Sequence, residues 1–349
     1  MNPGNKRLLP WWQIVLLDIL ALGIALCVFS LFHHVLPKKG NGPITSIVNV
    51  GGETSAAGGT VSAITTGAPS TSGNNAGATT SAEATATASS GGSSSAGTVG
   101  DFTSTFPKGK ITGDHAYAYA DDKVRITIDK KSADNVTYFV ADIYLSNIKY
   151  FKTAFANNTY GQGYAQEHLE LAKANNAILA ISGDYYGARS SGLVIRNGKL
   201  YRETLFNDVC ILYADGTMET MAKEDFNLDA AIKKGAYQGW SFGPMLLKNG
   251  GETMTKDEFN NKVNPQNPRS SIGYYAPGHY CFVTVDGRQP GYSDGYTLEE
   301  MSKLYASLGC KAAYNLDGGQ TVEMSFKGET VNKPYNGGRA CSDIVYIGE

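Results

Sequence analysis

The sequence predicts an α+β fold: a single globular domain with a mixed β-sheet and flanking helices, preceded by one transmembrane helix and a disordered linker. Aromatic and β-branched residues are sparse in the preceding stretch and return from Phe106 onward. The roughly 240 residues that follow are enough for one substantial core. Strand-like segments outnumber helical ones, and their order is irregular, which favours α+β over a regular strand–helix alternation.

Residues 1–36 are expected to form a membrane anchor. Residues 14–32 are almost wholly apolar, and a spanning helix needs about 20 such residues. Trp11 and Trp12 suit the membrane–water interface. A cleaved signal peptide is the alternative, but no small-x-small cleavage site follows Ser30. We therefore expect an uncleaved, single-pass signal-anchor in the cell membrane, with the globular domain extracytoplasmic.

Residues 37–105 are expected to form a flexible linker. Most of this segment consists of Ser, Thr, Gly and Ala, with few large apolar or charged residues. Such a composition cannot bury enough apolar surface to offset the conformational entropy lost on ordering. The third segment, residues 106–349, is then the catalytic or binding domain.

The first half of the globular segment contains four predicted strands and one helix. Residues 124–128 alternate apolar and polar side chains, as in a half-buried strand, and residues 136–145 have a similar character. Residues 165–174 have helical spacing, and the apolar residues 177–181 predict a buried strand. Residues 193–198 predict a strand that ends in an Asn-Gly hairpin turn.

The second half contains one clear helix and the strand that follows it. Thr297 and Glu300 form a capping box, which predicts a helix start. The apolar side chains of Met301, Leu304 and Leu308 mark its buried face, and Gly309 predicts its end. The next apolar run, residues 312–316, predicts a strand that leads directly to an acidic residue and two glycines.

Composition excludes several classes of function. The formal net charge is −2, which argues against a general nucleic-acid binder. The sequence contains no Walker loop, HExxH or GxSxG motif. Four cysteines follow the anchor, and none forms a CxxC pair, so we do not expect a zinc site. A divalent cation beside acidic residues is an alternative that no metal-loop spacing supports, and we expect no metal or cofactor. Buried thiols are favoured over two disulfides; these cysteines are Cys210, Cys281, Cys310 and Cys341.

Three acidic residues follow predicted strands and lie next to glycines: Asp184, Asp286 and Asp317. Such strand ends could bring the carboxylates into one cleft, although each alone is more often a capped turn or a surface ion pair. Arg269 and Arg288 have the planar geometry that binds phosphate or carboxylate in a bidentate manner. This combination suits a phosphorylated carbohydrate. The aromatic rings that could stack on sugar faces are those of Tyr185, Tyr186, Tyr274 and Tyr275.

The order of these motifs resembles the phosphodiester glycosidase family, which includes the animal "uncovering" enzyme and bacterial exopolysaccharide-type members. The resemblance covers residues 178–347. Two departures stand out: Ser182 replaces an Asn of the family pattern, and residues 320–323 replace Gly-Ser-Ser-Thr, so the sugar pocket must differ. The matching motifs are Ser182-Gly183-Asp184-Tyr185-Tyr186, Gly192-Leu193-Val194-Ile195-Arg196-Asn197-Gly198, Phe242-Gly243-Pro244-Met245-Leu246, Asn267-Pro268-Arg269-Ser270-Ser271-Ile272-Gly273, Val285-Asp286-Gly287-Arg288, Gly295-Tyr296-Thr297-Leu298 and Asn315-Leu316-Asp317-Gly318-Gly319.

The resemblance implies hydrolysis of the sugar C1–O bond of a sugar-1-phosphodiester in a glycan, cell-wall or exopolysaccharide polymer. It implies Asp317 as the leading catalytic residue, with Asp184 and Asp286 as the other carboxylates. The substrate-binding residues expected from it are Arg269, Arg288, Arg339, Gly318, Gly319, Thr321 and Tyr185. The expected partners are a sugar-phosphate diester or a cell-surface polysaccharide, and the lipid bilayer through the first helix. The alternative is a non-catalytic carbohydrate-binding or polymer-assembly protein on the same fold.

Overall fold

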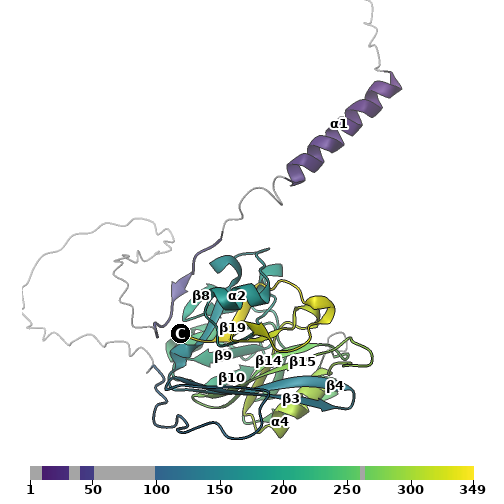
Figure 1. The fold of residues 1–349 in the computed structure, drawn as a ribbon. Helices are drawn as coiled ribbons and strands as arrows, with labels where there is room; N and C mark the ends of the chain where they lie inside the picture. Colours follow the sequence, from purple (N-terminus) through teal and green to yellow (C-terminus); the bar gives the residue numbers. More distant parts are fainter. Residues whose placement is uncertain (1–9, 31–39, 51–98, 260–263) are drawn as a thin grey trace, which may run out of the picture.

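The computed structural model describes residues 10–30, 40–50, 99–259 and 264–349 (Figure 1). Its globular part is a single α+β domain rich in strands, as predicted. Besides the N-terminal helix, the described α-helices are short: α2 (His168–Ala174), α3 (Leu228–Lys234) and α4 (Leu298–Ser307). α2 packs on strands β6 and β19, whereas α4 packs on β12 and β13. Figure 1 shows these two helices at opposite ends of the domain.

The strands form three sheets. In spatial order, the six-stranded sheet contains β1 (Thr45–Ser46), β8 (Lys199–Arg202), β7 (Val194–Arg196), β11 (Ala236–Trp240), β9 (Val209–Tyr213) and β10 (Met218–Met221). The eight-stranded sheet contains β13 (Glu252–Thr253), β12 (Met245–Lys248), β16 (Ala312–Asn315), β14 (Arg269–Ala276), β15 (His279–Val285), β4 (Val136–Leu145), β3 (Val124–Ala133) and β2 (Tyr117–Ala120). The five-stranded sheet contains β18 (Glu329–Thr330), β17 (Met324–Phe326), β6 (Leu179–Ser182), β19 (Asp343–Ile347) and β5 (Phe151–Phe155).

Every pairing between these strands is antiparallel, so the sheet that the sequence predicted as mixed is antiparallel throughout its described strands. Tight turns join β3 to β4 and β14 to β15, and a tight turn can only join antiparallel neighbours. The longer connections that carry α2 and α4 lead to β6 and β16, which also pair only with antiparallel neighbours.

One hydrophobic core joins the three sheets. It contains Ile126 of β3 and Phe282 of β15 from the eight-stranded sheet, Ile181 of β6 from the five-stranded sheet, and Trp240 of β11 from the six-stranded sheet. All four side chains are fully buried. Because the three sheets share this core, residues 106–349 cannot be divided into separately packed units, which explains the single domain.

The local predictions hold at several elements. β4 has the predicted bounds, and β3 continues five residues beyond the predicted end. The hairpin between β7 and β8 turns at Asn197 and Gly198, whose φ angles are 50° and 75°. α4 begins after Thr297, whose hydroxyl accepts a hydrogen bond from the Glu300 N–H, as the capping box requires. The helix predicted from residue 165 begins only at His168.

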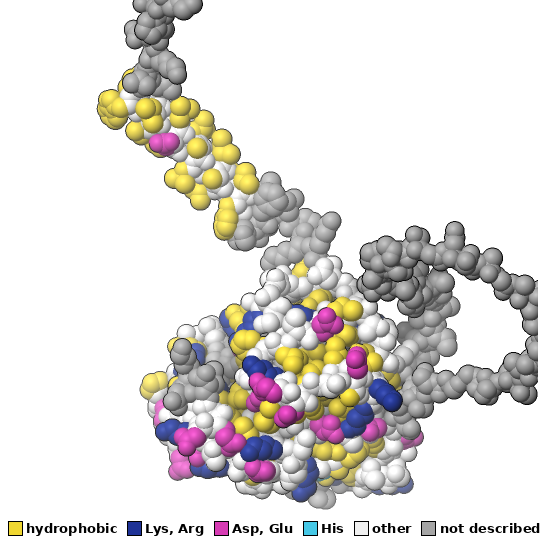
Figure 2. Space-filling model, turned by 180° about the vertical axis from the view of Figure 1, so that it is seen from behind, with side chains coloured by type: hydrophobic (Ala, Val, Ile, Leu, Met, Phe, Trp, Pro, Cys, Tyr) yellow, Lys and Arg dark blue, Asp and Glu magenta, His cyan; other side chains and the backbone are white. Residues whose placement is uncertain are grey.

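The N-terminal helix α1 (Trp11–Ser30) is long and apolar enough to cross a membrane, although a signal sequence near the N-terminus has the same properties. Figure 2 shows hydrophobic side chains covering this helix, whereas the visible face of the globular part mixes Lys and Arg with Asp and Glu. No single-sign patch dominates that face, in keeping with the near-neutral net charge.

Two segments assigned to the linker lie against the globular part. In residues 40–50, the N–H groups of Ile44 and Ile47 donate to the carbonyls of Leu200 and Gly198, both at 2.7 Å. Phe102, in the segment before the predicted boundary, is buried. Side chains also hold the first segment, because Val48 is buried and Val50 packs against the core. The largely apolar run from Ile47 to Val50 was a local signal that the overall composition of the predicted linker concealed. Residues 51–98, the centre of the predicted linker, lie outside the described residues.

Candidate functional site

Asp317 lies at the junction of two sheets. It follows β16 of the eight-stranded sheet, and its N–H donates to the carbonyl of Gly183 at 2.9 Å, directly after β6 of the five-stranded sheet. Two strand ends that are more than 130 residues apart in sequence therefore meet. This pairing brings Asp184 and Asp317, two of the three predicted carboxylates, to the same place.

The Asp317 carboxyl is unusual for its degree of burial. Its side chain is only 13% exposed. Burial raises the pKa of this carboxyl to about 6; the hydrogen bond with Thr321 and the charge of Arg339 oppose this rise, and the negative charge of Asp184 adds to it. A raised pKa of this kind makes Asp317 a candidate for a catalytic carboxyl.

Arg339 is the cation in contact with Asp317. Its Nη2 lies 3.2 Å from Asp317 Oδ2, and its Nε donates to the Thr321 hydroxyl at 3.1 Å. Its guanidinium carbon lies 5.1 Å from the centre of the Tyr185 ring, a cation–π contact. The Arg339 side chain remains 43% exposed, so it can also contact a ligand. These contacts join four predicted site residues around one point.

Arg288 approaches the glycine turn that follows Asp317. A Cβ added at Gly319 would lie 3.2 Å from Arg288 Nη1, and the φ of Gly319 is +69°, a left-handed conformation that favours glycine. Arg288 Nε donates to Asn267 Oδ1 at 2.8 Å. Arg288 is exposed and lies against the same turn, so the turn carries Arg339 on the Asp317 side and Arg288 beside Gly319.

Arg269, predicted to bind phosphate, is buried and braces the backbone instead. Its Nε donates to the Tyr296 carbonyl at 3.0 Å, and its Nη2 donates to the Pro265 carbonyl at 2.7 Å. Burial lowers the pKa of Arg269 to about 10, and the positive charge of Arg288 adds to this effect. The structure therefore assigns Arg269 to positioning the backbone beside Arg288.

Asp286, predicted as an alternative catalytic carboxylate, is fully engaged in structural hydrogen bonds. It accepts from the Tyr292 hydroxyl at 2.8 Å, from Asn332 Nδ2 at 2.8 Å and from the Lys333 N–H at 3.0 Å. It is 1% exposed. Burial raises its pKa, although these hydrogen bonds oppose the shift. Its bonds fasten residues 332–333 to the end of β15, and none of them involves Asp317.

Asp184 belongs to a buried ion cluster that the sequence analysis missed. Arg196 Nη2 lies 3.1 Å from Asp184 Oδ2, and Arg196 Nε lies 2.9 Å from Asp343 Oδ2. Asp343 Oδ1 also accepts from the Asp184 N–H at 3.0 Å. Burial raises the pKa of Asp343, against the attraction of Arg196. One signal was available: Asp343 is a charged residue that opens an otherwise apolar strand.

Because Asp184 is held by Arg196, it serves the site through its charge and its backbone. Its second oxygen, Oδ1, accepts from the Tyr186 N–H at 2.9 Å, so both oxygens are in use. The cluster fixes the backbone that receives the Asp317 N–H. Its negative charge also helps to raise the pKa of Asp317.

Arg189 is a second residue that the sequence analysis missed. Its guanidinium carbon lies 3.9 Å from the ring centre of Phe206, 5.0 Å from that of Phe242 and 5.8 Å from that of Tyr185. Within the described part of the chain, its buried Nη1 has no hydrogen-bond partner. Phe206 is 43% exposed, which is unusual for a large apolar side chain beside a cation. No local pattern around Arg189 marks it.

The site thus combines one carboxyl that titrates near neutral pH with two exposed arginines and an aromatic surface. The arginines suit an anion such as phosphate, and the rings of Tyr185 and Phe206 suit a sugar face. The carboxyl can face a centre that becomes positive. Such a set fits a ligand that joins sugar to phosphate.

The chain resembles known proteins in sequence and in fold. The model of a protein family described as phosphodiester glycosidase matches residues 175–348. The SPbeta prophage-derived protein YomE of Bacillus subtilis (strain 168) is 30% identical over 198 residues, which cover 54% of this chain. The chain spans only 30% of that relative's length.

Two solved structures share the fold. The catalytic domain of zebrafish N-acetylglucosamine-1-phosphodiester alpha-N-acetylglucosaminidase, auto-inhibited by its pro-peptide, has a TM-score of 0.51 and 20% identity, covering 65% of this chain and 83% of that one. A hypothetical protein from Synechocystis has a TM-score of 0.50 and 12% identity, covering 65% and 62%. The family match includes β16, the Asp317 turn and Arg339, and on this ground the chain belongs to the phosphodiester glycosidase family.

Proposed function

We propose that this protein is a membrane-tethered, extracytoplasmic hydrolase that cleaves the sugar C1–O bond of a sugar-1-phosphodiester within a glycan, cell-wall or exopolysaccharide polymer. The observation that carries the proposal is the Asp317 carboxyl, whose pKa is raised to about 6 and which is paired with the partly exposed Arg339. The family match and the activity named for the zebrafish relative support the same class of reaction.

The two arginines bind the diester phosphate in this proposal. Arg339 contacts Asp317, and Arg288 lies beside Gly319 of the same turn; in the proposal both donate to one phosphate. Guanidinium groups bind phosphate through paired, charge-assisted hydrogen bonds. Holding the phosphate also fixes the position of C1, and orientation of this kind accounts for much of enzymatic rate enhancement.

Asp317 acts in its ionised form at C1. As the C1–O bond breaks, its electron pair goes to the phosphate oxygen, and positive charge develops on the sugar ring. The leaving group is a phosphomonoester with a second pKa of about 6, so it departs without strong general-acid help. Water supplies a hydroxyl to C1 and releases a proton. One reactive carboxylate therefore suffices, which agrees with Asp184 being held by Arg196.

The membrane tether in this proposal is α1. Its length and apolar surface support spanning. A signal sequence is the other reading of the same helix, and N-terminal sequencing of the mature protein in its native host distinguishes the two. An intact N-terminus supports the anchor, whereas cleavage after α1 contradicts it.

Hydrolysis in ¹⁸O-labelled water tests the reaction. The full chain in detergent micelles is incubated with a panel of sugar-1-phosphodiesters, and both products are examined by mass spectrometry. Cleavage at C1–O places the label in the free sugar. Label in the phosphate, with sugar-1-phosphate as product, would show P–O cleavage and overturn the proposal. Glycan binding without turnover across the panel would favour the non-catalytic alternative.

A further inference from the structure

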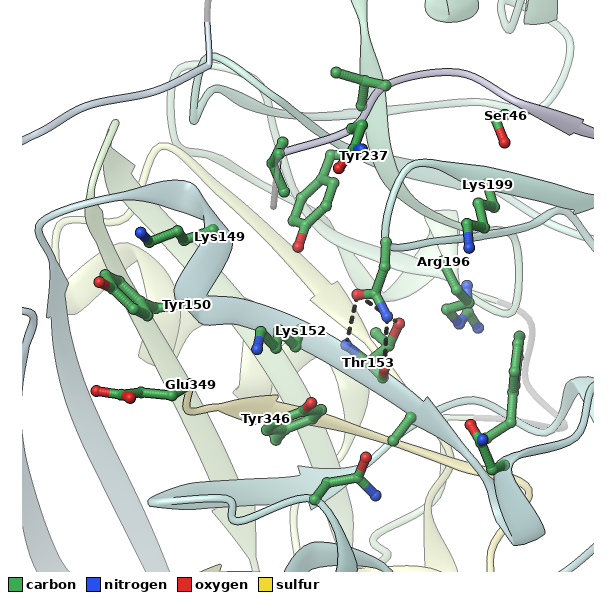
Figure 3. A pocket seen from close by; sticks show the side chains of 18 of the residues that line it. Ser46, Lys149, Tyr150, Lys152, Thr153, Arg196, Lys199, Tyr237, Tyr346 and Glu349 are labelled. Atoms are coloured by element: carbon green, nitrogen blue, oxygen red, sulfur yellow. Dashed lines mark hydrogen bonds between the residues drawn. The ribbon is translucent and has the colours of Figure 1, made fainter. Parts of the chain in front are cut away.

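A second concave region lies apart from the Asp317 turn. It is a cleft of about 1290 Å³ between residues 46–50, the strand β5 with η2 (Ile148–Tyr150) before it, and the β7–β8 hairpin (Figure 3). Asp317, Arg339 and Arg288 do not line it. Its volume is large enough for several sugar or polyol-phosphate units, since drug-sized ligands occupy about 300–1,000 Å³.

Lysine side chains dominate the charge of this cleft. Lys123, Lys149, Lys152 and Lys199 line it, and Figure 3 labels the last three around the opening. Among the described residues that line it, Glu349 is the only acidic one, and it pairs with Lys123. In the described part of the chain, no ion pair involves any of the other three lysines. Arg196 also lines the cleft but is paired with Asp184 and Asp343. Apart from it, the four lysines and Glu349 give the described lining an excess of about three positive charges at neutral pH.

Lys152 shows the cost of this arrangement. It is partly buried in β5, and burial lowers its pKa. The positive charge of Lys149 acts in the same direction, whereas Glu349 opposes it. A partly desolvated ammonium beside a second cation is destabilising unless an anion neutralises it. An anionic ligand in the cleft would supply that neutralisation.

The rest of the lining suits a polyhydroxylated chain. Tyr150, Tyr201 and Tyr346 also line the cleft, with Tyr150 and Tyr346 largely buried in its walls, and Asn158 adds an exposed amide. Tyrosines of this kind combine an apolar face with a polar tip, which matches the two faces of a sugar ring. Lysine is a compact point charge that tolerates phosphates at varied positions.

We propose that this cleft binds a phosphodiester-linked glycan or polyol chain, as a holding site for a distal segment of the polymer that is cleaved at Asp317. The identity of the polymer as substrate rests on the proposed function, whereas the binding itself does not. Arg196 lines the cleft and pairs with Asp184 at 3.1 Å, so the cleft lies beside the back of the reactive site.

Two other occupants fit the cleft less well. A bilayer surface is broad and cannot enter a concave site of this kind. Residues 51–98 of this chain contain only two acidic residues, Glu53 and Glu83, and therefore lack the repeated negative charge that three lysines would neutralise.

Binding of polyanions to the full chain in detergent micelles tests the proposal. The probes are long-chain inorganic polyphosphate and poly(glycerol phosphate), with affinity measured against salt concentration. The variant is Lys149→Ala/Lys152→Ala/Lys199→Ala. The matched control is Lys233→Ala/Lys256→Ala/Lys311→Ala, which removes three exposed lysines outside the cleft.

We expect the cleft variant to bind both probes at least tenfold more weakly. The slope of log K (binding constant) against log salt concentration should be smaller in magnitude by about 2, as for three lost phosphate contacts. The control should stay within about twofold of the parent protein. Hydrolysis of a small sugar-1-phosphodiester should be unchanged in both variants, and thermal melting shows whether each is folded.

Three results would overturn the cleft proposal: equal binding by the cleft variant, an equal loss in the control, or tighter binding of short-chain phosphatidylserine than of either polymer through the same lysines. If small diesters are hydrolysed but the cleft substitutions leave polymer binding unchanged, the cleft proposal alone fails. If polymers bind through the cleft but no diester is hydrolysed, the proposed reaction alone fails.

Discussion

Asp286 and Asp317 begin from nearly the same local sequence and end in opposite environments. Each follows a buried strand and precedes a glycine. Asp286 is 1% exposed and receives hydrogen bonds from three separate groups. Asp317 has one guanidinium in contact and remains partly open. The first carboxylate has its charge satisfied by the fold, and the second is left available for a ligand.

The difference arises from distant parts of the chain. Asn332 and Lys333 supply donors to Asp286, whereas Thr321 and Arg339 approach Asp317. Thr321 is only four residues from Asp317, whereas Arg339, Asn332 and Lys333 lie 22 or more residues from the carboxylates that they contact and are not visible in the local sequence. The comparison teaches that a carboxylate at a strand end is a candidate for catalysis when the tertiary structure leaves it without a full set of hydrogen-bond donors.

The largest expected effect breaks the comparison directly. Asp317→Asn should lower kcat/KM by on the order of 10³, because the neutral amide cannot stabilise positive charge at C1. Asp286→Asn should leave the activity of the folded protein within about threefold, because its partners are structural, and should lower stability by about 1–3 kcal/mol. Steady-state kinetics and thermal unfolding measure the two effects separately.

Circular dichroism provides the control that Asp317→Asn is folded. The assignment of the two carboxylates would be reversed if Asp286→Asn abolished turnover in a fully folded protein while Asp317→Asn retained it.

The pH dependence of activity should show an effect of intermediate size and tests whether Asp317 is the titrating carboxyl. Because the pKa of Asp317 is raised to about 6, its ionised form prevails above that pH, and activity should fall as the pH drops through about 6. Arg339 lowers this pKa, so Arg339→Ala should move the acidic limb to higher pH and reduce kcat/KM by about 100-fold. Arg339→Lys should show a smaller shift.

The pH dependence of kcat/KM for the three proteins gives the measurement. An acidic limb that stays in place in Arg339→Ala would mean that Asp317 is not the titrating group. Activity lost on the alkaline side of pH 6 would assign Asp317 as a general acid instead.

The smallest expected effect concerns Arg189, which lies beside Tyr185 and away from the carboxylate itself. Arg189→Ala should raise KM by about tenfold with kcat little changed, because contacts to remote parts of a substrate contribute equally to ground and transition states. Arg189→Lys keeps the charge but loses the planar stacking on Phe206, so its KM should lie between those of the parent protein and Arg189→Ala. A fall in kcat at constant KM would contradict this role.

Local structure was largely predictable from the sequence. The bounds of β4, the Asn197-Gly198 turn and the Thr297 cap follow from short-range patterns that the fold retains. The order of motifs also identified the family, since the Asp317 turn and Arg339 lie within the matched residues.

Partnerships across the chain were not predictable. Arg196 and Asp343 are 147 residues apart and meet only because β7 and β19 belong to sheets that share a core. The bracing role of Arg269 depends on carbonyls at Pro265 and Tyr296, which no side-chain pattern reveals. Arg189 contacts the ring of nearby Tyr185 and the rings of Phe206 and Phe242 on two other segments.

The pairing of β1 with β8 limits the distance between the globular domain and a membrane. Asn41, Ile44 and Ile47 are already fastened to the domain through their backbone N–H groups. If α1 spans the bilayer, only ten peptide bonds separate Ser30 from residue 40. The extended chain between them is at most roughly 35 Å long, at 3.3–3.6 Å per residue. The long Ser/Thr/Gly-rich stretch would then not lengthen this connection, because the residues at both of its ends contact the same globular domain. Shortening it should leave the distance between enzyme and bilayer unaltered.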